Sequence, residues 1–358
     1  MTKNTKGSSP QFSLLNKLDT SLDALWKPFT AATPRNHLSP AKITAVYNAF
    51  WYFAAERQNI FFNRMNRSNE NWTTDPILSE FKFTNAYRAS DRVSQYLIRH
   101  VIYRDDLPKT ANEVFFRTIL FKLFNKIETW EHLEKKIGPL VFEDYDFARY
   151  DSVLWNLKGS GAKIYSAAYI MHPGSSAFGH KYKHQNHLKL LETMIADGLP
   201  EQIAETKRMQ EGFELLRKYP TIGDFLGYQL ITDINYSELT DYSEMEFVVP
   251  GPGALDGISK CFSSLGGLNT AEIIRLMVDI QDAEFERLGL QFQSLWGRKL
   301  QLIDCQNLFC EISKYSRISH PDVPGISNRK RIKQKFVPNS QSIRYWFPPK
   351  WNINNGDK

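Results

Sequence analysis

Apolar residues recur at helical spacing along most of this chain, whereas strict alternation of apolar and polar residues is sparse. Residues 45–65, AVYNAFWYFAAERQNIFFNRM, carry apolar side chains on more than one face, which predicts a buried helix. The preceding Ser39-Pro40 is typical of an N-cap followed by a proline at the first helical position. The pattern therefore predicts a mainly α fold whose first long helix begins here.

The helical spacing continues through the rest of the chain, without an internal repeat. Helices are expected in residues 90–103, 111–137, 187–219, 221–237, 270–289 and 302–317. Residues 159–187 mix Gly, Ser and His and are expected to form loops. Within them, His180, His184 and His187 have helical ligand spacing, but no nearby cysteine or carboxylate completes a shell. We therefore predict a polar surface loop here and no metal site.

The two ends of the chain differ in composition from its body. Residues 1–38 are rich in Ser, Thr, Asn and Pro, which predicts a flexible polar tail. Residues 39–324 form the predicted helical domain. Residues 325–358 interleave cations with aromatics and are predicted to be a basic arm that follows a DNA backbone, with a solvated tail as the alternative. Its candidates for phosphate contacts are Arg329, Lys330, Arg331 and Lys333.

The overall composition narrows the class of protein. Of 358 residues, 42% are hydrophobic and 13% aromatic, enough for a full core, and the formal charge of +6 suits a polyanionic partner. The three cysteines form no C-x-x-C pair, which disfavours a disulfide framework or a thiolate zinc site. The start has no apolar signal region, and no apolar run is long enough to cross a membrane. We expect a cytoplasmic protein without a membrane partner.

Residues 246–262, EFVVPGPGALDGISKCF, contain a rigid string of Pro and Gly residues. The spacing of Gly251, Gly253 and Gly257 is one residue longer than the G-x-G-x-x-G of a dinucleotide-binding loop, and no G-x-x-x-x-G-K-[ST] loop occurs. The string VPGPG resembles instead the hairpin of helix-hairpin-helix DNA glycosylases. That resemblance predicts a hairpin at residues 249–257 whose amides at Gly251 and Gly253 hold a DNA phosphate. A plain structural turn is the alternative.

A second motif follows the expected hairpin. Asp304 is the second residue of the stretch IDCQN (303–307), and glycosylases of the same superfamily have a catalytic aspartate downstream of their hairpin. A fixed carboxylate can stabilise the cationic deoxyribose that forms when a base leaves. An ordinary helix N-cap is the alternative role for Asp304. Leu255 stands where bifunctional members carry a lysine, so Schiff-base lyase chemistry is not expected.

The chain also resembles a narrower family over most of its length. The residues that carry this resemblance are AAERQNIFFNR (54–64), NWTTDPILSEFKFTNAYRASDRVSQYLI (71–98), FNKIETW (124–130), GPGALDGI (251–258) and LIDCQNLFCEISKY (302–315). The family is that of α-glutamyl/putrescinyl-thymine pyrophosphorylases. Its relatives include amino acid:DNA transferases, the helical domain of 5-hydroxymethyluracil DNA kinases and antiviral glycosylases that act on modified phage DNA. The resemblance implies a modified pyrimidine in double-stranded DNA as substrate.

Either kind of enzyme must hold the base outside the duplex, so the sequence should supply a pocket with aromatic walls and polar side chains. Arg88 and Lys82 are candidates to hold a phosphate or a charged base adduct, and Asn85 is a candidate to read a pyrimidine edge. Buried ion pairs without a role in binding are the alternative for the charged members. The full set of predicted pocket residues is Glu56, Arg57, Trp72, Lys82, Asn85, Arg88 and Asp91.

These motifs together predict a fold like that of helix-hairpin-helix DNA glycosylases, with two intimately packed helical subdomains. The leading predicted reaction is monofunctional hydrolysis of an N-glycosidic bond at Asp304, in antiviral defence, with no cofactor and no obligate protein partner. Lys260, Lys314 and Arg317 are predicted to contact DNA phosphates. The first alternative is a transferase that replaces pyrophosphate on a phosphorylated 5-hydroxymethyl-pyrimidine with an amino acid or polyamine, its leaving group held by Lys82, Arg88 and Arg92. The second is a protein that binds modified DNA without chemistry.

Overall fold

The computed structural model describes residues 39–66, 72–167, 171–338 and 344–354; the predicted tail at residues 1–38 lies outside them. The described chain is mainly helical, which confirms the predicted fold class. The first half comprises β1 (Lys42–Ile43), α2 (Ala45–Asn66), α3 (Pro76–Glu80), η1 (Arg88–Ser90), α4 (Arg92–Tyr96), η2 (Leu97–Ile102), α5 (Ala111–Phe124), α6 (Ile127–Ile137), α7 (Phe147–Gly159) and α8 (Ser175–Phe178). The second half comprises α9 (Lys183–Ala196), α10 (Leu199–Glu205), α11 (Met209–Arg217), α12 (Asp224–Ile234), α13 (Pro252–Cys261), β2 (Phe262–Ser264), α14 (Thr270–Asp279), α15 (Gln281–Arg287), α16 (Leu302–Ser319) and η3 (Pro349–Trp351).

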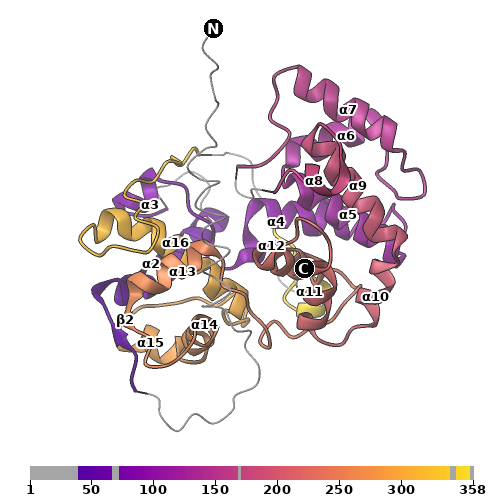
Figure 1. Cartoon of the computed structure of the whole chain (residues 1–358). Helices are drawn as coiled ribbons and strands as arrows, with labels where there is room; N and C mark the ends of the chain where they lie inside the picture. The colour runs from indigo at the N-terminus through magenta and orange to yellow at the C-terminus, as the bar shows by residue number, and fades with distance from the viewer. Residues whose placement is uncertain (1–38, 67–71, 168–170, 339–343, 355–358) are drawn as a thin grey trace.

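The helices form two lobes, and the chain passes from one lobe to the other and back again (Figure 1). One lobe, here called the terminal lobe, combines α2 and α3 with α13 to α16 and the antiparallel pair β1–β2. The other, the middle lobe, contains α4 to α12. Among the described residues, η1 is the point where the chain first passes between the lobes, and it contacts α16. The two predicted helical subdomains therefore interleave in sequence.

The N-terminus of α2 differs from the prediction made from Ser39-Pro40. The helix begins at Ala45, and the Thr44 hydroxyl accepts a hydrogen bond from the Val46 amide at 3.1 Å. Ile43 just upstream pairs instead with Phe262 of β2. A hydroxyl cap close to the first apolar residues outcompetes the upstream Ser-Pro pair, because the intervening residues are held in strand pairing.

Four of the expected helices are divided into shorter elements, and those at residues 187–219 and 270–289 become α9 to α11 and α14 to α15. The expected helix at residues 111–137 is two helices, α5 and α6, because Asn125 adopts a left-handed conformation with φ of 48°. Asn is one of the few residues that enter this conformation readily, so it terminates α5 as a C-cap. The expected helix at residues 90–103 begins as α4 and continues as a π-helical turn over Leu97–Ile102.

The structure corrects the bounds of the predicted hairpin at residues 249–257, because most of these residues lie in a helix; the hairpin itself stays a prediction. Residues 252–257 are the first turns of α13, with Gly251 as N-cap and Pro252 at the first helical position. The glycines instead allow α13 to approach its neighbours: a Cβ on Gly257 would lie 2.0 Å from the Phe309 carbonyl oxygen of α16. A Cβ on Gly251 would lie 2.5 Å from the Phe225 ring, and one on Gly253 would lie 3.0 Å from Cys310 Sγ.

Two of the three histidines of the expected surface loop are buried, which is a second correction, whereas His180 is half-buried. His184 and His187 lie on α9 with 1% and 0% exposure. His184 Nε2 lies 2.8 Å from the Asp151 carboxylate, and His187 is hydrogen-bonded to the His172 carbonyl oxygen and the Tyr165 hydroxyl. Burial lowers the pKa of His187 to about 4, so its imidazole is neutral near pH 7. These two rings stabilise the middle lobe.

The C-terminal arm consists of two parts with different surroundings. Residues 325–338 are extended along the terminal lobe, where the Phe336 amide donates to the Glu80 carbonyl oxygen at 2.9 Å. Residues 344–354 pack into the protein, and Phe347 is only 1% exposed. No helix of the described chain is long and apolar enough to cross a membrane.

Candidate catalytic site between the two lobes

Asp304 lies in the first turn of α16, at the junction of the lobes, with 4% exposure. It occupies the third helical position, and Oδ2 accepts a hydrogen bond from the amide of the N-cap residue Gln301 at 3.0 Å. Its Oδ1 accepts one from the Arg88 amide at 2.8 Å. Asp304 is therefore part of a capping box and is not itself the N-cap. Its carboxyl group bridges α16 and η1.

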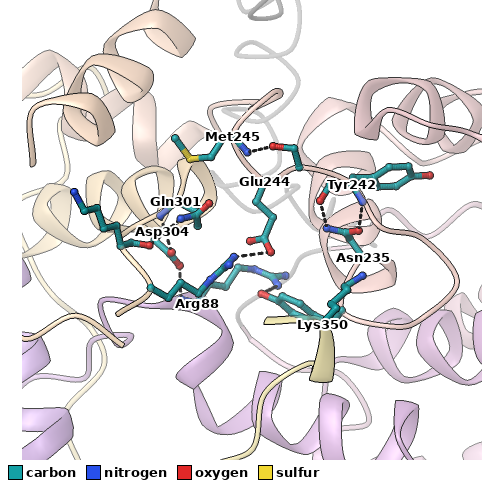
Figure 2. Close-up of polar contacts among 12 residues, drawn as sticks. Arg88, Asn235, Tyr242, Glu244, Met245, Gln301, Asp304 and Lys350 are labelled. Atoms are coloured by element: carbon teal, nitrogen blue, oxygen red, sulfur yellow. Dashed lines mark hydrogen bonds and ion pairs between the residues drawn. The ribbon is translucent and has the colours of Figure 1, made fainter. Parts of the chain in front are cut away.

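Arg88 connects the two lobes through its two ends, and Figure 2 shows the end that holds Asp304. While its amide holds Asp304, its guanidinium forms a double hydrogen bond with the buried Asp233 carboxylate of α12, at 2.7 and 3.0 Å. Lys122 of α5 lies 3.2 Å from the same carboxylate. Desolvation would raise the pKa of Asp233, but the two cations outweigh it and hold that pKa below its ordinary value. For Arg88, the structure therefore shows the alternative role, that of a buried ion pair.

Glu244 and Arg298 form the second charged pair at the junction. Glu244, on the connection between α12 and α13, accepts a hydrogen bond from Arg298 at 2.8 Å. Figure 2 shows the Glu244 side chain between Asp304 on one side and Lys350 on the other. The Arg298 guanidinium lies 3.8 Å from the centre of the Trp351 ring, and its Nε is buried without a hydrogen-bond partner. An oxygen of a bound substrate could accept a hydrogen bond from this Nε–H group.

The surroundings of Asp304 at the junction shift the pKa of its carboxyl group toward neutral pH, so that it can exchange a proton there. Burial raises the pKa of Asp304 to about 7, with a smaller contribution from the Glu244 charge and against the two amides and Arg298, which lower it. Desolvation also lowers the pKa of Lys350, which donates to the Ser237 and Thr240 carbonyl oxygens. A carboxyl group with such a pKa can act as a general acid or base.

A second polar cluster surrounds Asp91 on the other side of η1. The Asp91 carboxylate accepts a hydrogen bond from the Asn85 amide at 2.8 Å, and Arg57 donates to the Asn85 side-chain oxygen at 2.8 Å. The Thr84 amide donates to Glu311 at 3.2 Å, and the Thr84 hydroxyl is buried without a partner. Desolvation raises the pKa of Asp91 to about 7. The structure thus brings three predicted pocket residues, Arg57, Asn85 and Asp91, into direct contact.

The other predicted pocket residues lie apart from this cluster. Glu56 accepts a hydrogen bond from Thr73 at 2.5 Å, and Trp72 packs beneath Arg64. Lys82 is exposed on the terminal lobe. Arg92 lies on α4 in the middle lobe, 3.9 Å from Glu128. The expected pyrophosphate-holding group of Lys82, Arg88 and Arg92 is therefore not assembled, because these side chains point to different surroundings.

The predicted DNA-contacting cations divide into buried and exposed members. Lys260 is 3% exposed and donates to the Ser313 carbonyl oxygen and the Ser316 hydroxyl, so its ammonium group stabilises the α13–α16 contact. Lys314 pairs with Glu311 at 2.5 Å, and Arg317 donates to the Arg331 carbonyl oxygen. The exposed members are Arg329, Lys330, Arg331 and Lys333. For these four, contact with phosphates stays a prediction that their exposure permits.

The predicted phosphate contacts of Gly251 and Gly253 also stay predictions. Both glycines lie at the start of α13 beside α16, and a Cβ on Gly251 would lie 3.4 Å from the side-chain nitrogen of Gln306, two residues after Asp304. The two sequence motifs therefore meet in space. The amide of Ala254 in the same turn is hydrogen-bonded to Cys310, which leaves fewer donors for a phosphate than the resemblance implied.

Sequence reasoning missed Glu244, Arg298, Asp233 and Trp351. Glu244 lies just before the VPGPG string, and Arg298 lies six residues before Asp304, so proximity to the two motifs was a usable signal. Asp233 had no such signal, because its partners Arg88 and Lys122 are more than a hundred residues away in the sequence. No group of three or more His, Cys, Asp or Glu side chains within the described ranges is arranged to hold a metal ion.

Comparison with known proteins places this architecture in a family. Residues 44–325 match the family described as "5-hmdU DNA kinase, helical domain", and the chain belongs to it. A curated relative is the 5-hmdU DNA kinase of Bacillus phage SP10, 27% identical over 321 residues, which are 84% of this chain and 50% of the relative. The chain thus spans about half the length of that relative. No solved structure gave a significant match. The predicted relationship with DNA glycosylases stays a prediction.

Proposed function

We propose that this protein acts on a modified pyrimidine in DNA by transferring a group at the 5-substituent of the base. The observation that carries the proposal is the Asp304 carboxyl group, buried between the lobes beside Glu244 and Arg298. Membership in the helical-domain family of 5-hmdU DNA kinases supports a 5-modified pyrimidine as substrate and transfer in preference to hydrolysis. The sequence has no G-x-x-x-x-G-K-[ST] loop, so we do not assign phosphoryl transfer from a nucleotide to it.

The chemistry of the transfer requires a group that accepts a proton. An amine of an amino acid or polyamine would attack the methylene carbon, forming a C–N bond while the C–O bond to pyrophosphate breaks. The amine then releases a proton, and Asp304, with a pKa of about 7, would accept it. The unpartnered Nε of Arg298 would donate to an oxygen of the leaving group.

Glycosidic hydrolysis is the second candidate, and a specific observation favours it. The Asp304 carboxylate is fixed by two amides, at 2.8 and 3.0 Å, in the first turn of α16. A carboxylate held so rigidly could stabilise a cationic deoxyribose while the base departs. This mechanism needs only the ionised form of Asp304.

Product analysis distinguishes these reactions. We would incubate the protein with duplex DNA carrying 5-hydroxymethyluracil or the derivative with pyrophosphate on its methylene, with and without amines, and identify the nucleosides by mass spectrometry. A new amine adduct supports transfer, whereas alkali-labile strand breaks support hydrolysis. DNA binding without either product would contradict both.

The variant Asp304→Asn tests the assigned carboxyl group. It should lower the rate of either reaction by about a hundredfold or more, the range seen when a catalytic acid–base or electrostatic group is removed. Duplex binding, measured by fluorescence anisotropy, should stay within about twofold, since one of the two amide contacts can be kept. The control is Asp282→Asn, on an exposed pair with Lys299. Full activity of Asp304→Asn would exclude Asp304 from catalysis.

A further inference from the structure

Trp296 occupies a strained turn that presents its side chain. Its φ is 48°, a left-handed conformation that bulky residues adopt rarely, and Gly297 follows at φ of 90°. The turn is closed by a pair of backbone contacts between Leu295 and Arg298. Strain of this kind persists only where the surrounding structure enforces it, and it is concentrated at functional sites. The strain therefore indicates that the tryptophan side chain at this position has a function.

The indole ring is available to a partner. Trp296 is 41% exposed, although three aromatic rings, Phe61, Phe62 and Phe347, pack against it at centroid distances of 5.7 to 6.4 Å. All three neighbours are buried. The ring is thus supported from behind by a rigid aromatic group while part of its surface faces solvent. Such an arrangement holds an aromatic plane ready for stacking.

The turn is fixed to the same segment that holds Asp304. The Tyr87 hydroxyl donates to the Arg298 carbonyl oxygen at 2.5 Å and accepts from the Leu295 amide at 3.3 Å, so it ties both ends of the turn. Burial and the nearby Asp304 carboxylate raise the pKa of Tyr87, which keeps its hydroxyl protonated and able to donate. The next residue, Arg88, donates its amide to Asp304. The position of Trp296 is therefore set relative to Asp304 by two consecutive residues.

We propose that Trp296 stacks on a nucleobase at the entrance to the Asp304 site and holds the DNA strand while the target base is extruded. The proposal rests on the function proposed above. Base–aromatic stacking is independent of base identity, so it suits a strand-holding role better than a role in reading the modification. Arg298, at the other end of the turn, pairs with Glu244, so the same turn links Trp296 to the charged pair beside Asp304.

The decisive variants keep the turn intact. Trp296→Gly accepts a φ of 48° without strain and removes the ring, whereas Trp296→Phe keeps an aromatic plane. The matched control is Trp155→Ala, since Trp155 is 44% exposed and packs on Tyr182 in the middle lobe. The probes are fluorescein-labelled oligothymidine and a duplex with one 5-hydroxymethyluracil next to 2-aminopurine. Anisotropy reports affinity, and 2-aminopurine fluorescence reports disturbance of the base stack.

Trp296→Gly should weaken binding of oligothymidine by about ten- to a hundredfold and abolish the 2-aminopurine response. Trp296→Phe should lose much less of the affinity for oligothymidine, because it keeps an aromatic ring. Trp155→Ala should bind like the wild type. Equal affinity of Trp296→Gly and wild type, for correctly folded proteins by circular dichroism, would overturn the proposal. Neither readout requires a product, so stacking without turnover would refute the proposed reaction alone.

Discussion

At the scale of single residues, the site depends on carboxyl groups whose protonation is shifted by burial. Asp304 and Asp91 lie on opposite sides of η1, and both have a pKa raised to about 7. The structure places neither of them beside a free cation of the predicted pocket. Arg88 is committed to Asp233, and Arg57 to Thr84 and Asn85. Desolvation therefore outweighs the nearby arginine charges for both carboxyl groups and keeps their pKa above the ordinary value.

The titration of Asp91 should be visible in folding stability. An unfolded aspartate loses its proton near pH 4, whereas folded Asp91 keeps it up to about pH 7. The folded state therefore binds more protons in this window, and the Asp91 contribution to the free energy of unfolding falls as the pH rises. The free energy of unfolding of Asp91→Asn, measured by urea denaturation, should rise relative to that of the wild type by about 1 kcal/mol per pH unit between about pH 5 and 7. The control Asp105→Asn, on an exposed side chain, should give a constant difference; a constant difference for Asp91→Asn would contradict the shift.

At the scale of elements, close contact between α13 and α16 positions the site. Of the glycines in the VPGPG region, Gly253 and Gly257 lie where a side chain or the backbone of α16 approaches α13, and Gly251 lies against the Phe225 ring of α12. Lys260, Ser313 and Asp256 add a buried polar group to the same contact, with Ser313 donating to Asp256 at 2.5 Å. Because Asp304 lies in the first turn of α16, any displacement of this helix from α13 moves the catalytic candidate.

Substitution of Gly257 tests this contact. Gly257→Ala places a methyl group 2.0 Å from the Phe309 carbonyl oxygen, and backbone cannot move aside cheaply. We expect a loss of about 3 kcal/mol or more in the free energy of unfolding, the upper range for overpacking. Gly159→Ala is the matched control, since no heavy atom lies within 4 Å of its Cβ position in α7, and it should be neutral or stabilise by about 0.5–1 kcal/mol. Similar chemical denaturation midpoints for both variants would show that the α13–α16 distance is not limiting.

At the scale of the whole molecule, the two lobes are joined by the bonds of Arg88 and covered by the C-terminal arm. In the arm, Lys350 donates a hydrogen bond to the connection between α12 and α13. Phe347 of the arm is buried and packs against Trp296. Its packed half therefore belongs to the junction, while the exposed cations of residues 329–333 remain candidates for DNA contacts.

Removal of the central carboxylate tests the junction. Asp233→Asn would leave Arg88 and Lys122 buried without the charge they share, which should cost about 3–5 kcal/mol of unfolding free energy. Limited proteolysis should then cut between the lobes before it cuts within them. The control Asp282→Asn breaks an exposed pair with Lys299 and should change stability by less than about 1 kcal/mol. Wild-type stability of Asp233→Asn would show that this ion pair does not hold the lobes together.

The sequence by itself determined the helical class and the family, because helical periodicity and short motifs are local properties that each segment carries alone. It also indicated Asp304 and the Arg57–Asn85–Asp91 cluster, whose members lie within motifs that resemble the family. Only the tertiary structure decided that VPGPG starts a helix packed on α16, that Arg88 pairs with Asp233, and that Glu244, Arg298 and Trp351 meet beside Asp304. The physical reason is that periodicity tells which face of a helix is buried but not which distant segment covers it. Charged side chains within that contact take whichever partner the packing supplies.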